Sequence, residues 1–320
     1  MRALVLEAEH ELPSVKDVPR PKAGPGQVVV KVAASGLNYA DTMMRRGFYL
    51  QKPQFPYTPG FEFSGIVEEI APDVKTVRPG DRVMGTGQGT FAEYATAAPL
   101  MLMPVPEGFS DEEAAAFPVV YLTALGMLRL SAKAVAGETI LIHAAAGGVG
   151  TAAIQLSKHL GLRVIATASS EQKLVLARSL GADVTINYGS GNWVDAVMTA
   201  THGRGVDIVF ESIGGDFLDR DVQAAAPFGR IVVFGMASGD LPKADVGAMF
   251  HHSVSVGAFW MFTLAMNPDL LSAVSRELLE IVRKANIRPV IGKVCSLEEA
   301  PGAIQAMEQR RTTGKIILKP

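Results

Sequence analysis

Residues 139–150 read TILIHAAAGGVG, and this stretch decides the fold. Residues 139–142 are mostly β-branched or leucine and predict a buried strand. Gly147 and Gly148 then predict a tight turn, and the apolar residues that follow recur at helical spacing up to Gly161, which can end a helix. A strand, a glycine turn and a helix in this order form the setting in which a backbone approaches the pyrophosphate of a dinucleotide.

After this strand, five more predicted strands alternate with helical segments, which gives six in all. Strands are expected at 139–143, 163–167, 184–188, 206–211, 230–234 and 254–259. Strands that alternate with helices predict an α/β fold with a doubly wound, six-stranded parallel sheet.

The first hundred or so residues have a different character. They contain short β-rich runs separated by frequent glycines and prolines, which predicts a small barrel-like lobe. A helix over about 268–285, a strand near 289–294 and a closing strand at 315–318 complete the chain. At 320 residues, two lobes are the expected organisation.

Composition gives weaker indications. The net charge of -2 gives no reason to expect nucleic acid or an anionic membrane as a partner. Cys295 is the single cysteine, which excludes an intramolecular disulfide and favours a reducing compartment. The longest apolar run, 117–128, is too short to span a bilayer. We therefore expect a cytoplasmic location.

The glycine turn predicts a cofactor site. Residues 145–150 match the dinucleotide fingerprint with its first glycine replaced by Ala145. Gly147 and Gly148 would let the backbone approach phosphate, and Gly150 would let the helix pack on the sheet. A turn without a ligand is the alternative for an isolated match, but the five further strands favour the cofactor. The expected contacts are Ala146, Gly147, Gly148, Val149 and Gly150.

The end of the second strand indicates which cofactor. NAD enzymes place a carboxylate there for the ribose hydroxyls, whereas this chain continues with Ser169 and Ser170, and then Lys173. A 2'-phosphate needs cationic and hydroxyl partners, so NADPH is favoured. Lys173 taken alone could be an ordinary surface lysine. Ser169 and Gln172 have capping-box spacing, which predicts that the next helix starts at Ser169.

The residue types required for a metal site are sparse. The chain has six histidines and one cysteine, and none of them forms a spacing typical of zinc ligands. His251 and His252 are adjacent, so on a strand they would point to opposite faces. We expect no metal.

At several of these positions the chain resembles the medium-chain dehydrogenase/reductase superfamily, in its zinc-free quinone oxidoreductase (zeta-crystallin-like) branch. Zinc alcohol dehydrogenases carry Gly-x-Cys-x-x-Asp and Gly-His-Glu, whereas residues 36–41 read GLNYAD and residues 60–62 read GFE. Asn38 and Phe61 thus replace both zinc ligands. The resemblance covers essentially the whole chain. It implies a GroES-like, β-rich catalytic domain over 1–118 and 261–320, and a Rossmann dinucleotide-binding domain over 119–260.

The resemblance also implies roles for single residues. Asn38, Tyr49 and Thr123 would line the nicotinamide and substrate site. Lys173, Tyr188 and Arg310 would contact the adenosine phosphate, with Arg311 as the alternative to Arg310. Backbone segments at the nicotinamide end would include Phe234, Gly235, Met236, Gly257 and Phe259.

These features lead to three alternative functions. The favoured one is an NADPH-dependent quinone oxidoreductase, because hydride transfer to a conjugated acceptor needs orientation and hydrogen-bond donors rather than a Lewis acid. Asn38 and Tyr49 are the candidate donors. An enoyl or enone reductase with Tyr49 as proton donor is the second, and a non-enzymatic NADPH-binding protein is the third. We also expect a homodimer formed through an edge strand at 253–258, as in the family.

Overall fold

The computed structural model describes residues 1–50 and 52–320 as two compact units. Unit 1 comprises Met1–Val120 and Arg288–Pro320, and unit 2 comprises Tyr121–Ile287. The second boundary differs from the one expected at 260/261, because two helices after residue 260 belong to unit 2. One of them carries Glu277, which forms an ion pair with Arg129 of the same unit at 2.5 Å.

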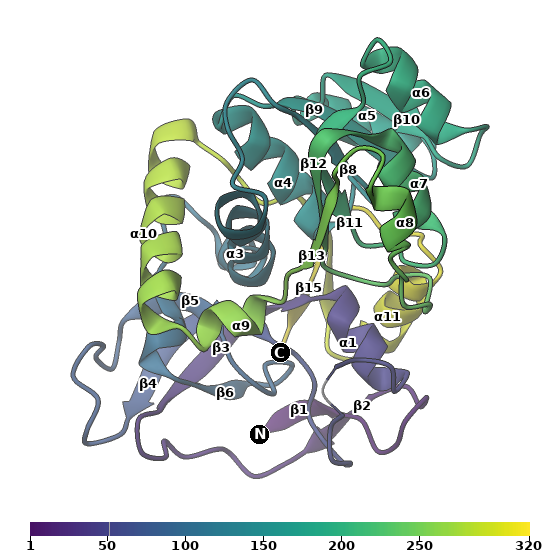
Figure 1. The fold of residues 1–320 in the computed structure, drawn as a ribbon. Helices are drawn as coiled ribbons and strands as arrows, with labels where there is room; N and C mark the ends of the chain where they lie inside the picture. The colour runs from purple at the N-terminus through teal and green to yellow at the C-terminus, as the bar shows by residue number, and fades with distance from the viewer. Residues whose placement is uncertain (51) are drawn as a thin grey trace. The chain divides into compact units, whose positions relative to one another are not determined.

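Unit 2 is built on a six-stranded sheet in which every neighbouring pair is parallel (Figure 1). Its strands are β8 (Thr139–Ile142), β9 (Arg163–Ala168), β10 (Val184–Asn187), β11 (Val206–Glu211), β12 (Ala225–Val233) and β13 (Ser255–Ala258). The order β10-β9-β8-β11-β12-β13 reverses direction at β8, as a doubly wound sheet requires. The six expected strands are confirmed, although β12 starts five residues earlier than its apolar run.

Helices precede, connect and follow these strands along the chain. They are α3 (Pro118–Gly126), α4 (Gly148–His159), α5 (Glu171–Ser179), α6 (Trp193–Ala200), α7 (Phe217–Ala224), α8 (Val246–Met249), α9 (Met261–Ala265) and α10 (Pro268–Ala285), with a π-helical turn η2 (Met127–Ser131). Leu141, Ile165 and Val209 from three strands are fully buried against Trp193 and Leu218. Burial of such side chains contributes roughly 1.5–3 kcal/mol each to stability.

Unit 1 contains the β-rich lobe expected from the first hundred residues. Its elements are β1 (Arg2–Val5), β2 (Ser14–Asp17), β3 (Val28–Leu37), α1 (Tyr39–Arg45), β4 (Glu62–Ile70), β5 (Arg82–Thr86), β6 (Tyr94–Ala97), η1 (Pro99–Met101), β7 (Leu102–Pro104), α2 (Asp111–Ala115), β14 (Ile291–Ser296), α11 (Ala300–Glu308) and β15 (Lys315–Lys319). A seven-stranded sheet runs β14-β15-β3-β4-β5-β7, with β6 also paired to β3.

The two ends of the chain meet in that sheet. Strand β15 lies beside β3 (Figure 1) and pairs antiparallel with it, so that Ile316 lies opposite Leu37 in the register. This pairing brings Lys315, at the start of β15, to the point where β3 ends and α1 begins. None of the helices in the described ranges has the length and apolar content needed to cross a bilayer.

Candidate active-site residues

The glycine turn after β8 has the geometry of an anion-binding helix start. Gly147 caps α4 with extended backbone angles (φ -81°, ψ 176°), and its N–H donates to the Ala144 carbonyl at 2.9 Å. The first backward helical bond runs from Thr151 N–H to Gly147 O, so the amides of residues 148–150 precede the hydrogen-bonded helix. These amides and the positive end of the helix dipole suit a phosphate.

Gly150 is required by close packing. A Cβ added there would lie 2.6 Å from the Ala144 carbonyl oxygen and 2.7 Å from Ala145, which are backbone atoms that cannot move aside. Ala144 itself has a positive φ of 46°, so the turn is already tight. A Cβ at Gly147 would meet only the Ala144 oxygen, at 3.3 Å, which leaves its outer side open.

The end of β9 lacks a carboxylate in the structure as in the sequence. Lys173 Nζ lies 3.5 Å from the Ser169 hydroxyl, which joins the two expected 2'-phosphate contacts. Glu171, in the first turn of α5, pairs with Arg178. The expected helix start at Ser169 is wrong, because the N-cap of α5 is Ser170 and Ser169 instead lies beside Lys173.

The other expected cofactor contacts in unit 2 share one edge of the sheet. Tyr188 follows β10, residues 234–236 follow β12, and Phe259 follows β13, which includes Gly257. Because the sheet is parallel, these positions and the glycine turn lie at its carboxyl edge, where such folds bind ligands. Phe259 packs on Gly126 of α3 so closely that a Cβ at Gly126 would lie 2.5 Å from the ring. Buried Thr123 lies one turn earlier on α3.

Unit 1 contains Asn38, Tyr49 and Arg310. Asn38 is the N-cap of α1, and it is buried. The Tyr49 ring is half-buried, with its centroid 6.1 Å from that of Phe61. Arg310 is exposed in the turn after α11, has a left-handed φ of 58°, and is followed by exposed Arg311.

Both ends of the Asn38 amide are already hydrogen-bonded within unit 1. Its Nδ2 donates to Glu62 Oε1 at 2.8 Å and to the Gly36 carbonyl at 3.3 Å, while its Oδ1 accepts from Lys315 Nζ at 2.9 Å. Glu62 and Lys315 fix this orientation of the amide. A flipped amide would place its oxygen against the Glu62 carboxylate and its NH2 group against the Lys315 ammonium. The geometry does not support Asn38 as a donor to substrate.

Lys315 and Glu62 form a buried ion pair. The Lys315 ammonium donates to Glu62 Oε1 at 2.5 Å, to Asn38 Oδ1 and to the Leu37 carbonyl at 3.0 Å. Glu62 Oε2 accepts from the Val119 N–H at 2.8 Å. Lys315 is 3% exposed and Glu62 is fully buried. We did not identify Lys315 from the sequence, although a lysine at the start of an otherwise apolar strand was a usable signal.

This cluster does not fit zinc. Asn38 stands where the zinc alcohol dehydrogenases have the thiolate ligand, and Phe61 stands where they have the imidazole ligand. The charge of Glu62 is balanced by Lys315. Zinc sites need three or four thiolate, imidazole or carboxylate ligands. Within the described residues, three side chains of such types do gather elsewhere, at His143, Glu211 and Asp221 of unit 2.

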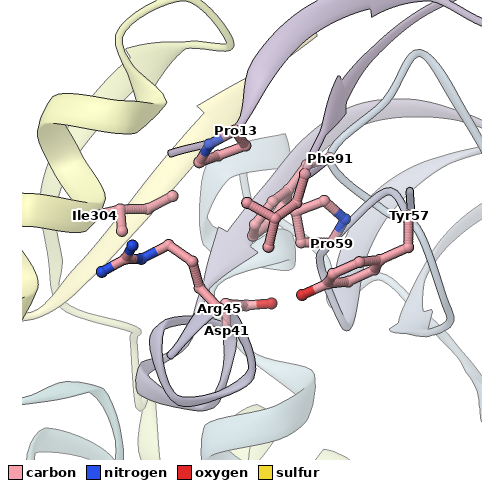
Figure 2. Close-up of a pocket in the computed structure, with 8 residues that line it drawn as sticks. Pro13, Asp41, Arg45, Tyr57, Pro59, Phe91 and Ile304 are labelled. Carbon is pink, nitrogen blue, oxygen red and sulfur yellow. The ribbon is translucent and has the colours of Figure 1, made fainter. Parts of the chain in front are cut away.

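Asp41 lies on the other side of the α1 N-terminus. Its carboxylate accepts from the N–H groups of Asn38 at 2.8 Å and Gly60 at 3.1 Å. Burial raises the pKa of Asp41 to about 7, against the effect of these bonds and of Lys315. Figure 2 shows the Asp41 carboxyl and the Tyr57 hydroxyl pointing toward one another beside a cavity of about 10 Å³. That volume is near the minimum for one water molecule, so the cavity is too small to hold a substrate.

Comparison with known proteins adds family-level evidence. Residues 24–107 match the alcohol dehydrogenase GroES-like domain, and residues 148–276 match the domain described as zinc-binding dehydrogenase. The chain is 37% identical to quinone oxidoreductase-like protein 2 of Bos taurus, over 99% of this chain and 91% of that protein.

Solved structures match both units. A mycobacterial protein complexed with NADPH has a TM-score of 0.94 at 32% identity, covering 100% of both chains. The quinone oxidoreductase of Thermus thermophilus, solved alone and with NADPH, has a TM-score of 0.87 at 35% identity and the same coverage.

Proposed function

Because the chain belongs to the zinc-free quinone oxidoreductase branch of the medium-chain dehydrogenase/reductase superfamily, we propose that it binds NADPH and reduces a quinone without a metal ion. When bound, NADPH supplies the hydride, and a quinone that also gains one proton leaves as a hydroquinone. The residues of the chain bind and orient both molecules.

The glycine turn and the end of β9 support NADPH as the cofactor. The amides of residues 148–150 can hold the pyrophosphate at the start of α4, and Gly150 keeps the turn against the helix. Ser169 and Lys173 lie together where a carboxylate would repel a 2'-phosphate. The two solved NADPH complexes agree with this assignment.

The buried cluster of Asn38, Glu62 and Lys315 is the observation that carries the choice of acceptor. It fills the positions of the metal ligands with an amide and an internal ion pair, so these side chains cannot hold a Lewis acid to stabilise an alkoxide. A quinone spreads the incoming charge over its conjugated system and needs much less stabilisation at one oxygen. The cluster therefore favours conjugated acceptors over alcohols.

A panel of acceptors tests the proposal. NADPH oxidation is measured at 340 nm with naphthoquinone, phenanthrenequinone, crotonyl-CoA and a simple enone, and with a primary alcohol and NADP⁺ as the opposite reaction. We expect quinone turnover, no alcohol oxidation, and rates that do not change with a chelator. Quinone rates at background level would refute the proposal.

Tyr49 supports a second candidate, an enone or enoyl reductase. Its half-buried ring lies against Phe61. Of the two candidate hydrogen-bond donors, Asn38 is already bonded to Glu62 and Lys315, so Tyr49 is the one left to act as a proton donor. Reduction of an enone requires a proton at the α-carbon, which a tyrosine can supply directly or through water. Faster turnover of crotonyl-CoA than of any quinone would favour this function.

We further propose a homodimer formed through β13. This strand lies at the open edge of the unit 2 sheet. Phe228 of the neighbouring β12 and Phe250, five residues before β13, are 75% and 79% exposed. Unpaired strand edges with exposed apolar groups favour pairing with a second copy. A mass of one chain in light scattering at micromolar concentration would contradict the dimer.

A further inference from the structure

Beneath the glycine turn, unit 2 buries an imidazole and two carboxyl groups in contact with one another. His143 follows β8, Glu211 ends β11, and Asp221 lies on α7, and each of the three side chains is fully buried. His143 Nε2 lies 2.8 Å from Asp221 Oδ1. One carboxylate oxygen of Glu211, one of Asp221 and a ring nitrogen of His143 all lie within 4.8 Å of one another.

Two buried carboxyl groups this close together need a proton between them. Glu211 Oε2 and Asp221 Oδ2 are buried oxygens that no donor among the described residues reaches. If both groups were ionised, two like charges would face each other in a dry interior at a large cost. One proton between the carboxyls supplies the missing donor and removes one charge.

His143 does not supply this proton. Its Nδ1 lies 2.7 Å from the Thr167 hydroxyl and its Nε2 lies 2.8 Å from Asp221 Oδ1. If Oδ1 is an acceptor, the ring hydrogen is on Nε2 and Nδ1 accepts from Thr167. Burial lowers the pKa of His143 to about 4, with Glu211 acting against this shift and Arg220 with it, so the ring is neutral. The Trp193 and Phe217 rings pack edge-on against it, with centroids 4.9 and 5.2 Å away. The imidazole thus orients Asp221 and leaves the shared proton to the carboxyls.

The other oxygen of Glu211 holds the backbone after β11. Oε1 accepts from the N–H group of Ile213 and, at 2.6 Å, from that of Gly214. Gly214 and Gly215 both have positive φ, a backbone conformation that glycine adopts easily. Because glycines are also flexible, the two hydrogen bonds to Glu211 hold this turn in one conformation. A Cβ at Gly235, an expected cofactor contact, would lie 3.2 Å from Ser212 Cβ in the same turn.

We propose that Glu211 and Asp221 share one proton, and that this protonated pair, oriented by His143, positions the 212–215 turn at the carboxyl edge of the sheet. Glu211 is therefore a positioning residue for the cofactor site. The shared proton stands on the geometry of unit 2 alone, and only the consequence for NADPH affinity rests on the proposed function.

A metal ion would explain the same three side chains less well. Bonds of about 2.0–2.2 Å to a tetrahedral zinc keep ligand atoms about 3.3 Å apart. His143 Nε2 and Asp221 Oδ1 are 2.8 Å apart, which is a hydrogen-bond distance. Glu211 Oε1 is also committed to two backbone amides.

The proton gives the pair a characteristic pH dependence. Burial raises the pKa of Glu211 to about 8, with Asp221 adding to the shift and His143 opposing it, and burial also raises the pKa of Asp221, against Arg220. The folded chain then holds a proton that the unfolded chain releases above pH 4.5. Stability falls as pH rises from about 4.5 to 8 and levels above it.

Glu211→Gln tests this directly, because an amide keeps the acceptor for the turn and donates to Asp221 without titrating. In urea unfolding, we expect the folding constant of this variant, relative to wild type, to rise about 50-fold between pH 6 and 8. Glu280→Gln, at an exposed carboxylate on α10, is the matched control and should follow wild type within about twofold. Equal pH dependence in Glu211→Gln and wild type would overturn the proposal.

Two further measurements address the turn and the metal. NADPH affinity from nicotinamide fluorescence should fall above pH 8 in wild type and stay constant in Glu211→Gln, whereas Glu211→Leu should lose affinity at every pH. If no form binds NADPH, the proposed function fails while the unfolding result still decides the proton. Stabilisation of wild type, but not of Glu211→Gln, by added Zn²⁺ would overturn the shared proton in favour of a metal site.

Discussion

Replacing Lys315 by Met should destabilise unit 1 far more than removal of a surface lysine. The methionine fills a similar volume but removes the ammonium from a site that is 3% exposed. Three acceptors lose their donor: Glu62 Oε1, Asn38 Oδ1 and the Leu37 carbonyl. Glu62 keeps two donors, Asn38 Nδ2 and the Val119 N–H.

The magnitude follows from these losses. Breaking a buried ion pair by removing one partner costs about 3–5 kcal/mol, because the other charge stays buried. In a chain of this size, a loss of about 3–5 kcal/mol corresponds to a drop of roughly 6–20 °C in the melting temperature.

Thermal unfolding of wild type and Lys315→Met at pH 8 measures the effect. Lys284→Met, at a lysine that is 62% exposed and lies 3.5 Å from Glu280, is the matched control and should change stability by less than about 1 kcal/mol. The double variant Lys315→Met/Glu62→Gln should recover part of the loss, because no carboxylate remains. If Lys315→Met behaved like Lys284→Met at pH 8, the buried ion pair would have no energetic role and our reasoning would be wrong.

Three other substitutions test the cofactor and acceptor sites. Lys173→Ala should weaken NADPH binding by roughly tenfold, since a charge-assisted bond contributes about 1.5–3 kcal/mol, and leave NADH binding nearly unchanged; equal losses for both cofactors in fluorescence titration would contradict this role. Gly150→Ala should abolish NADPH binding, because the new Cβ would lie 2.6 Å from the Ala144 oxygen. The control is Gly302→Ala in α11, where a Cβ meets nothing within 4 Å, and it should stabilise the chain by about 0.5–1 kcal/mol. Tyr49→Phe should lower crotonyl-CoA turnover by about 10²–10⁴-fold and quinone turnover little; full activity on every acceptor would show that the hydroxyl donates no proton.

The sheet of unit 2 could be predicted because its signals are local. Each strand is a short apolar run, and the turn at residues 143–150 needs glycine where the backbone is crowded, as the close approach of Ala144 to Gly150 shows. The resemblance implied a boundary at 260/261, whereas the compact unit 2 continues to Ile287. The Arg129–Glu277 ion pair, which ties α10 to unit 2, joins residues 148 positions apart.

The buried polar clusters were missed for the same reason. Lys315 is separated from Glu62 by 253 residues, and Glu211 reaches Asp221 through the packing of α7 on the sheet. Sequence spacing therefore carried no information on these pairs. Asn38 was singled out by its motif, but its hydrogen bonds depend on Lys315, so its chemistry could not be predicted from the local sequence.

The two buried glutamates show that one chain can neutralise a carboxyl group in two different ways. Glu62 is paired with the Lys315 ammonium, so its environment needs no shared proton. Glu211 has no cation within hydrogen-bond distance among the described residues and, by our proposal, depends on a proton that is released near pH 8. Because the pKa of Asp41 in unit 1 is about 7, the comparison starts at pH 8, and a rise to pH 9 should loosen unit 2 at the 212–215 turn before it affects the β3–β15 pairing of unit 1. Hydrogen exchange at pH 9 would resolve the two: faster exchange at Gly214 with unchanged protection at the β3–β15 pairing supports this order, and simultaneous loss in both units would contradict it.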